Sequence, residues 1–93
     1  MTEKEKYLFG PDARVLMLLL EHDRINRSAF QSVYRMNIDA AKNSLNYFRS
    51  LGLTDFEEIG DRRDTMVWFL TDKGKIAAKL LAELIDLIEN ENQ

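Results

Sequence analysis

The chain has 93 residues, which is enough for one domain only, because a second would be too small to bury its own core. Hydrophobic residues make up 45% and charged residues 31%, and the absence of cysteine excludes disulfides, thiolate metal sites and thiol nucleophiles. The N-terminus is charged and is followed by only a short apolar run, which is typical of neither a signal peptide nor a membrane span. We therefore expect a cytoplasmic protein.

The net charge of −3 is distributed unevenly along the chain. Residues 24–52 carry five basic groups against one acid, whereas the segments 1–23, 53–71 and 72–93 are each negative. A polyanion would be met by this basic third of the chain. A chance cluster of solvated charges gives the same pattern, and the charge distribution alone does not separate the two interpretations.

Two helices are predicted in the first third of the chain. Gly10-Pro11-Asp12 indicates a helix start, because proline suits the first turn and aspartate favours the positive end of the helix dipole. The apolar run that follows predicts a largely buried helix over 11–21. Asn26 is a candidate N-cap for a short second helix, RSAFQSVYR, whose spacing places Phe30, Val33 and Tyr34 on one face.

A third helix is predicted from Asn37, a candidate N-cap, to the glycine at position 52, which is typical of a helix C-terminus. Its apolar stripe consists of Ala41, Leu45, Phe48 and Leu51. The opposite side carries five polar residues, Asp39, Lys42, Asn43, Asn46 and Arg49.

From Leu53 onward the pattern changes from helix to strand. LTDFEEI and TMVWFL are rich in β-branched and aromatic residues and are separated by GDRRD, so they predict a hairpin. Phe56 and Ile59 would point to opposite faces, which suggests a bulge near residues 57–58. Thr71 is a candidate cap for a last helix over about 72–89.

The apolar residues of this last helix cover more than one stripe. A terminal helix with so wide an apolar surface must bury a second side, most commonly against its own copy in another subunit. We therefore expect a homodimer interface formed by Leu80, Leu81, Leu84, Ile85, Leu87 and Ile88, with a contribution from Tyr7, Leu8 and Phe9.

The order of these elements resembles a winged helix-turn-helix domain, an α+β fold that is mostly α. "INRSAFQSVYRMNIDAAKNSLNYFRSLGL" resembles the helix-turn-helix stretch, and "DRR" followed by "FLTDKGKIAAKLL" resembles the wing and last helix of minimal MarR-like regulators. Residues 1–93 would form one such domain, with the helix-turn-helix at about 26–51, the wing at about 53–70 and a dimerisation helix at about 72–89. Three departures are Arg35, where the family usually has a small residue in the turn; the six residues DTMVWF between the second wing arginine and "LT", where the family usually has five; and the lack of the additional terminal helices of full-length MarR proteins. The last departure favours a minimal winged-helix protein without the ligand pocket of that family.

The resemblance implies a small dimeric transcriptional regulator that binds duplex DNA sequence-specifically. The third helix would lie in the major groove and the wing tip near the minor groove. Lysine, asparagine and aspartate can read base edges, whereas arginine suits phosphates. The expected DNA contacts are Arg27, Arg35, Asn37, Asp39, Lys42, Asn43, Asn46, Arg49, Arg62 and Arg63.

Acidic residues oppose part of this interpretation. Asp55, Glu57, Glu58, Asp61 and Asp64 lie in or beside the wing and would repel a phosphate backbone unless they face away. Winged-helix domains also serve as protein–protein interaction modules in larger assemblies, and the acidic hairpin favours that alternative. The basic segment 24–52 opposes it.

Enzymatic and metal-dependent functions have little support. DFEEIG places isoleucine where a calcium loop needs a ligand, and no glutamate closes the loop, so we expect no metal and no cofactor. With one histidine, no cysteine and no glycine-rich phosphate loop, the usual nucleophile–base sets cannot be assembled, so the protein is not expected to be an enzyme. His22 is interpreted as a helix-end or surface residue, and Tyr34, Tyr47 and Trp68 as core residues rather than an aromatic ligand site.

Overall fold

The computed structural model describes residues 3–59 and 66–90, with side chains from Gly10 onward. In this part of the chain the elements follow the order helix, strand, two helices, two strands, helix, and the three strands form one antiparallel sheet. The expected class, α+β and mostly helical, is confirmed. None of the described helices is both long and apolar enough to cross a membrane.

Helix α1 (Glu3–His22) consists of two helical segments joined at Gly10. Gly10 has φ 67° and ψ −163°, which interrupts the helix, and Pro11 then occupies the first turn of the second segment, where its missing N–H is not needed. The predicted start at Pro11 is confirmed. The preceding helical segment was not predicted.

A short strand, β1 (Arg24–Asn26), follows α1 and pairs with β3. Three residues are too few to show an alternating pattern, so the strand could not be predicted from local sequence. The prediction of Asn26 as a helix N-cap is wrong. Asn26 belongs to the strand, and its side-chain oxygen accepts from the backbone N–H of Ser28 at 3.1 Å.

Helix α2 (Ala29–Ser32) is much shorter than expected. Phe30 is fully buried and Tyr34 half-buried, but the side chain of Val33 is 62% exposed. The predicted common face of these three residues is therefore wrong for Val33. The regular helix ends at Ser32, so the helical spacing does not continue through Val33 and Tyr34.

Helix α3 (Ile38–Ser50) has the bounds that its end signals predicted. The side chain of Asn37 accepts hydrogen bonds from the backbone N–H groups of Asp39 and Ala40, at 2.9 and 3.1 Å. At the other end Gly52 has φ 79°, and the backbone N–H of Leu53 donates to the carbonyl of Phe48, which closes the helix. Both predicted ends are confirmed.

Strands β2 (Thr54–Glu58) and β3 (Met66–Leu70) form the predicted hairpin, with β3 in the centre of the sheet. The register runs without interruption from Thr54 opposite Leu70 to Glu58 opposite Met66, so the predicted bulge is wrong. Ile25, Trp68 and Phe56 form one row across the three strands. The rings of Phe56 and Trp68 lie 5.0 Å apart, and Trp68 is buried in the core.

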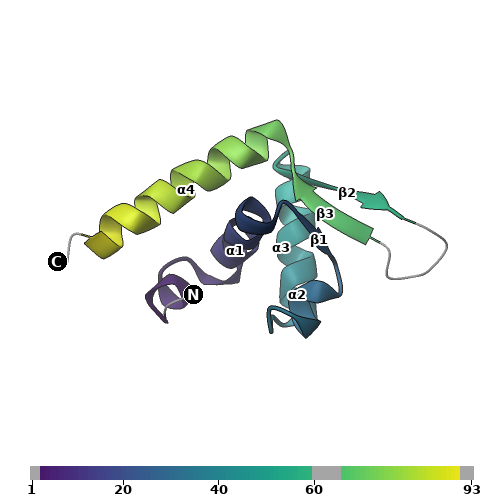
Figure 1. The fold of residues 1–93 in the computed structure, drawn as a ribbon, viewed down its shortest axis with the longest axis horizontal. Helices are drawn as coiled ribbons and strands as arrows, with labels where there is room; N and C mark the ends of the chain where they lie inside the picture. Colours follow the sequence, from purple (N-terminus) through teal and green to yellow (C-terminus); the bar gives the residue numbers. More distant parts are fainter. Residues whose placement is uncertain (1–2, 60–65, 91–93) are drawn as a thin grey trace.

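Helix α4 (Asp72–Asn90) begins where predicted, because the hydroxyl of Thr71 accepts from the backbone N–H of Gly74 at 3.0 Å. In Figure 1 the helix extends away from the sheet alongside α1, and its C-terminal turns and the first segment of α1 lie on the side opposite strands β2 and β3. Ala78 and Ile85 are buried, and Leu81 packs against the core.

Candidate nucleic-acid interface

The outer face of α3 carries hydrogen-bonding side chains along its whole length. Its inner residues Ala41, Ser44, Leu45 and Phe48 are buried, and this fixes the rotation of the helix. The predicted polar residues all lie on the opposite side and are exposed, namely Asp39, Lys42, Asn43, Asn46 and Arg49. The structure thus brings all five predicted residues onto one surface.

Two contacts made by buried polar side chains hold α3 against the rest of the molecule. The hydroxyl of Ser44 donates to the carboxylate of Asp12 at the start of the second segment of α1. The hydroxyl of Thr54, on β2, donates to the carbonyl of Leu45 at 2.9 Å. Because buried polar groups are costly to leave unpaired, these bonds favour one orientation of α3 relative to α1 and the hairpin.

The side chain of Asn37 caps the N-terminus of α3. Its side-chain oxygen already accepts from the N–H groups of Asp39 and Ala40. The cap therefore occupies these two amides, and the expected DNA contact of the exposed Asn37 side chain stays a prediction.

Arg49 is engaged within the molecule. Its Nε donates to the Asp55 carboxylate at 3.2 Å, and its guanidinium lies 4.8 Å from the ring centroid of Phe56. The backbone N–H of Phe56 and the Arg49 guanidinium hold the pKa of Asp55 below its ordinary value of 3.8. An acid of the hairpin is thus neutralised by a base of α3.

Arg24 repeats this arrangement at the other edge of the sheet. Its guanidinium is 2.8 Å from the Glu57 carboxylate and 5.3 Å from the ring centroid of Phe69. Each of the two arginines therefore lies over an aromatic ring of a hairpin strand and pairs with a hairpin acid. Two of the acids that opposed DNA binding in the sequence are thereby compensated locally, whereas Glu58 is exposed.

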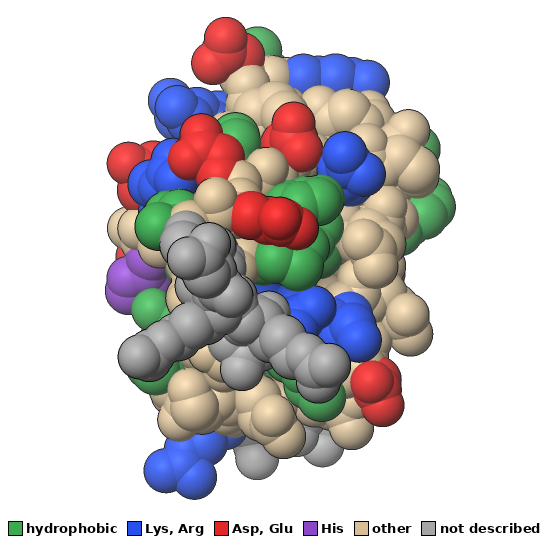
Figure 2. Space-filling model, turned by 90° about the vertical axis from the view of Figure 1, so that its right-hand side faces the viewer, with side chains coloured by type: hydrophobic (Ala, Val, Ile, Leu, Met, Phe, Trp, Pro, Cys, Tyr) green, Lys and Arg blue, Asp and Glu red, His purple; other side chains and the backbone are tan. Residues whose placement is uncertain are grey.

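The face toward which the hairpin projects has a mixed electrostatic character. Figure 2 shows acidic and basic side chains interspersed around an apolar patch, rather than a single basic surface. The hairpin tip, with Arg62 and Arg63 and the acids Asp61 and Asp64, lies outside the described residues. The predicted contacts of the two tip arginines stay predictions.

Comparison with known proteins rests on the fold. No protein-family profile matches the sequence, and no curated protein sequence matches it either. Solved structures do match. MarR, the multiple antibiotic resistance repressor, superposes with a TM-score of 0.77 at 12% identity, covering 97% of this chain and 66% of its own.

The protein F-93 of SSV1 has a TM-score of 0.66 at 21% identity, and the match covers 94% of this chain and 98% of that one. Streptococcus pneumoniae FabT, solved in complex with DNA, has a TM-score of 0.70 at 13% identity and covers 96% of this chain and 65% of its own. The chain thus spans about two thirds of MarR and of FabT but nearly all of F-93.

The chain has a MarR-like winged helix-turn-helix fold. In this fold α2 and α3 form the helix-turn-helix with α3 as its recognition helix, and β2 and β3 form the wing. The resemblance inferred from the sequence is confirmed at the level of the fold.

The other two predicted arginines lie on either side of α2, with Arg27 before it and Arg35 in the helix-turn-helix turn that follows it. Arg27 is half-buried, and its guanidinium donates to the sulfur of Met66 at 3.6 Å, at the start of β3. Arg35 is exposed and has φ 60°, a left-handed conformation that a non-glycine residue rarely adopts. The family usually has a small residue at this position, and arginine here adopts a more strained backbone conformation than glycine would.

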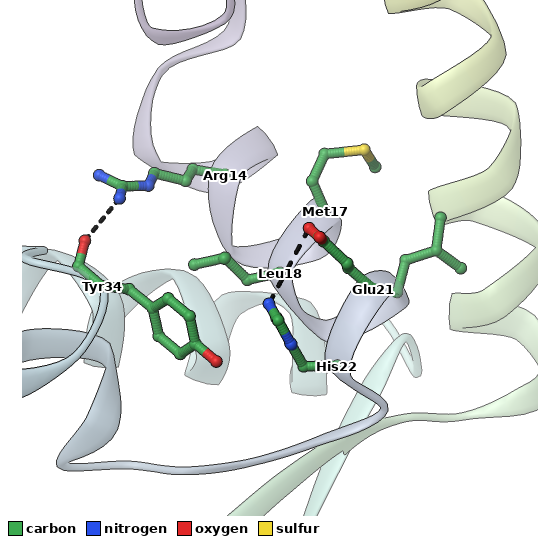
Figure 3. Close-up of a pocket in the computed structure, with 7 residues that line it drawn as sticks. Arg14, Met17, Leu18, Glu21, His22 and Tyr34 are labelled. Carbon is green, nitrogen blue, oxygen red and sulfur yellow. Dashed lines mark hydrogen bonds and ion pairs between the residues drawn. The ribbon is translucent and has the colours of Figure 1, made fainter. Parts of the chain in front are cut away.

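A cleft of about 530 Å³ lies between α1 and the residues that follow α2, lined by Arg14, Met17, Leu18, Leu20, Glu21, His22 and Tyr34 (Figure 3). The rings of His22 and Tyr34 lie 5.2 Å apart, and the interpretation of His22 as a surface residue at a helix end is confirmed.

Trp68 is a core residue as expected, but Tyr47 is 57% exposed on the recognition helix, so its assignment to the core is wrong. Three-residue clusters of His, Asp or Glu suited to a metal ion are absent among the described residues.

The outer face of α4 is apolar and exposed. Ile76, Leu80, Leu84 and Leu87 lie along one side of the helix and are 63%, 61%, 44% and 62% exposed, respectively. Two of the residues predicted for the dimer interface lie elsewhere, because Ile85 is buried and Leu81 packs against the core of its own chain. Ile88 is half-buried.

Several residues on the outer faces of α3 and α4 were not predicted from the sequence. Tyr47 and Ser50 lie four residues after Asn43 and Asn46, so the helical repeat would have placed them on the outer face of the recognition helix. Ile76 extends the apolar stripe of α4 by one turn and could have been found in the same way. Arg24 and its partner Glu57 are 33 residues apart in sequence, and no local signal indicates their contact.

Proposed function

We propose that the protein is a small homodimeric transcriptional regulator that binds duplex DNA sequence-specifically. The observation that carries this proposal is the exposed polar face of the capped recognition helix, which offers an aspartate, a lysine and two asparagines to base edges on one surface. The structural likeness to FabT, solved in complex with DNA, supports it. The cytoplasmic location expected from the sequence stays a prediction.

In this proposal the two halves of the recognition helix have different tasks. Asp39, Lys42 and Asn43 in the N-terminal half are placed to read bases, because helix-turn-helix proteins direct this half toward the floor of the major groove. Asn46 extends the reading surface. Arg49, which is already paired with Asp55, would meet a phosphate at the groove edge.

The dimer is proposed on the apolar face of α4. Four large aliphatic side chains exposed in a row are unusual on a lone subunit and suit a second copy of the same helix. Leu80, Leu84 and Leu87 are kept as interface residues, and Ile76 is added to them. The interface role first expected for Leu81 and Ile85 would be to support this row from beneath.

DNA titration at several salt concentrations tests the function. Each phosphate contact should contribute about 0.9 to the slope of the logarithm of the binding constant against the logarithm of the salt concentration. Selection from random duplexes should then enrich a site with two half-sites about one helical turn apart, roughly 34–36 Å. A linear salt slope without any enriched motif would contradict the sequence-specific part of the proposal.

The protein–protein interaction module is the second candidate. The interspersed charges of the wing face and the exposed Glu58 favour it. The local pairing of Asp55 and Glu57 with arginines weakens this argument, because these carboxylates are no longer an uncompensated acidic surface. Absence of salt-dependent DNA binding by the dimer would make this candidate the better one.

A further inference from the structure

The turn between α2 and α3 places an arginine in a conformation suited to glycine. Arg35 has φ 60°, and within the described residues only Asp23, at φ 70°, is another non-glycine residue with positive φ. Aspartate tolerates this region because its short side chain can bond locally, whereas the long side chain of arginine has no such advantage.

The surrounding contacts impose this backbone conformation. The backbone N–H of Arg35 donates to the carbonyl of Gln31 at 3.2 Å, and that of Met36 donates to the carbonyl of Phe30 at 2.8 Å. Phe30 and Met36 are both buried in the core. The chain therefore has to turn sharply between two anchored side chains, whatever residue occupies position 35.

Arg14 adds a further constraint from α1. Its guanidinium donates to the carbonyl of Tyr34, the residue immediately before Arg35 (Figure 3). The peptide group between Tyr34 and Arg35 is thus held by a side chain of α1, which lies outside the turn. The conformation belongs to the fold, and glycine at position 35 would adopt it with less strain.

The fold gains no side-chain contact from Arg35. Of the arginines in the described ranges, Arg14 bonds to Tyr34, Arg24 to Glu57, Arg27 to Met66 and Arg49 to Asp55. The side chain of Arg35 is exposed and has no such partner within the part of the chain that the structure describes. A strained backbone together with an unused cation indicates that the use of this side chain lies outside the chain.

We propose that Arg35 is a phosphate anchor of the helix-turn-helix, kept in a strained turn for its guanidinium; this inference rests on the proposed DNA-binding function. Arg35 lies two residues before the cap of the recognition helix, where the DNA backbone passes the helix N-terminus. The N–H groups of Asp39 and Ala40 there already donate to the Asn37 side chain, which leaves fewer free amides at this helix end. A side-chain donor would strengthen the binding of a phosphate here, and Arg35 supplies one.

Arg35→Gly should change stability and DNA binding in opposite directions. The melting temperature should rise by about 2–5 °C, because relief of the left-handed arginine exceeds the added entropy of the unfolded glycine. Binding to a mixed-sequence duplex of about 30 base pairs should weaken by roughly tenfold at low salt, and the salt slope should fall by about 0.9 for each subunit bound. Thermal melts and fluorescence anisotropy titrations measure the two effects.

Two matched variants separate charge from strain. Arg35→Lys keeps both the charge and the strain, so its melting temperature and salt slope should stay close to those of the unsubstituted protein. Asp23→Gly relieves the other positive φ outside the turn, so it should raise the melting temperature and leave the salt slope unchanged.

The outcomes distinguish this inference from the function on which it rests. If the unsubstituted protein binds DNA with a salt slope and Arg35→Gly keeps that slope, the anchor is refuted and the proposed function stands. If Arg35→Gly lowers the melting temperature, the strain argument is refuted. If the unsubstituted protein shows no salt-dependent binding at all, both proposals fall together.

Discussion

Helices α3 and α4 are both amphipathic, and both bury one side in the same core, but their outer sides differ. The outer side of α3 is mostly polar, whereas the outer side of α4 exposes four large aliphatic residues. A buried face tells how a helix packs in its own chain. The outer face tells what kind of partner it suits, in one case a hydrogen-bonding polyanion and in the other a second apolar helix.

Among the changes considered, a charge placed in the apolar face of α4 should have the largest effect on assembly and DNA binding. Leu84→Asp should give a folded monomer, because Leu84 is 44% exposed in the single chain. DNA affinity should then fall by about 10²–10³, since the two half-sites are no longer held together. Light scattering and DNA titration measure the two effects. Lys79→Glu, on the polar side of α4, is the control, and a dimer that survives Leu84→Asp would remove this face as the interface.

A substitution at the contact between α4 and the start of the wing should have the next largest effect, on the stability of the fold. A Cβ on Gly74 would lie 1.8 Å from the carbonyl oxygen of Leu53, and both groups belong to the backbone. Gly74→Ala should therefore lower the free energy of unfolding by about 3 kcal/mol, despite the better helix propensity of alanine. Urea denaturation measures it against Lys75→Ala, which should change stability by less than about 0.5 kcal/mol. Equal stability of the two variants would contradict the close approach.

Loss of the cap should weaken α3 moderately. Asn37→Ala removes the acceptor of the Asp39 and Ala40 N–H groups and should lower the free energy of unfolding by about 1 kcal/mol. Asn37→Asp keeps the cap and should retain stability while it weakens DNA binding, because it places a negative charge beside the expected phosphate. Thermal melts and DNA titrations of the two variants separate the two roles, and a fully stable Asn37→Ala protein would refute the cap.

The smallest effect concerns the pair of Arg49 and Asp55 and depends on pH. The pKa of Asp55 is lower in the folded chain than its ordinary value of 3.8. Its contribution to stability is therefore fully present above that ordinary value and is lost as the pH falls through the folded pKa, below 3.8. The stability difference between the unsubstituted protein and Asp55→Asn should shrink as the pH falls below 3.8, and it should be well below about 1 kcal/mol because both side chains are half-exposed. A difference that grows on acidification would contradict this assignment.

Local signals were sufficient for several elements. Asn37 and Gly52 marked the two ends of α3, Thr71 marked the start of α4, and the abundance of β-branched and aromatic residues marked the wing strands. These signals can be read because caps and helical repeats join residues within a few positions of one another. The polar face of α3, and with it most of the candidate site, followed from the same repeat.

Nonlocal contacts decided the features that were missed. Strand β1 exists because Arg24–Asn26 pairs with a strand more than 40 residues later, and Asn26 therefore belongs to this strand instead of capping α2. The ion pair of Arg24 and Glu57 could not be predicted either, because the two residues are 33 positions apart in the sequence.

The sequence by itself determined where the recognition helix begins and ends, which of its sides is polar and which side of α4 is apolar, since these properties are encoded by the residues of each helix. Only the tertiary structure decided which arginines are engaged by wing acids, that Arg35 stands in a left-handed turn and that Gly74 must be a glycine. These depend on distances between backbone and side-chain groups that only folding brings together.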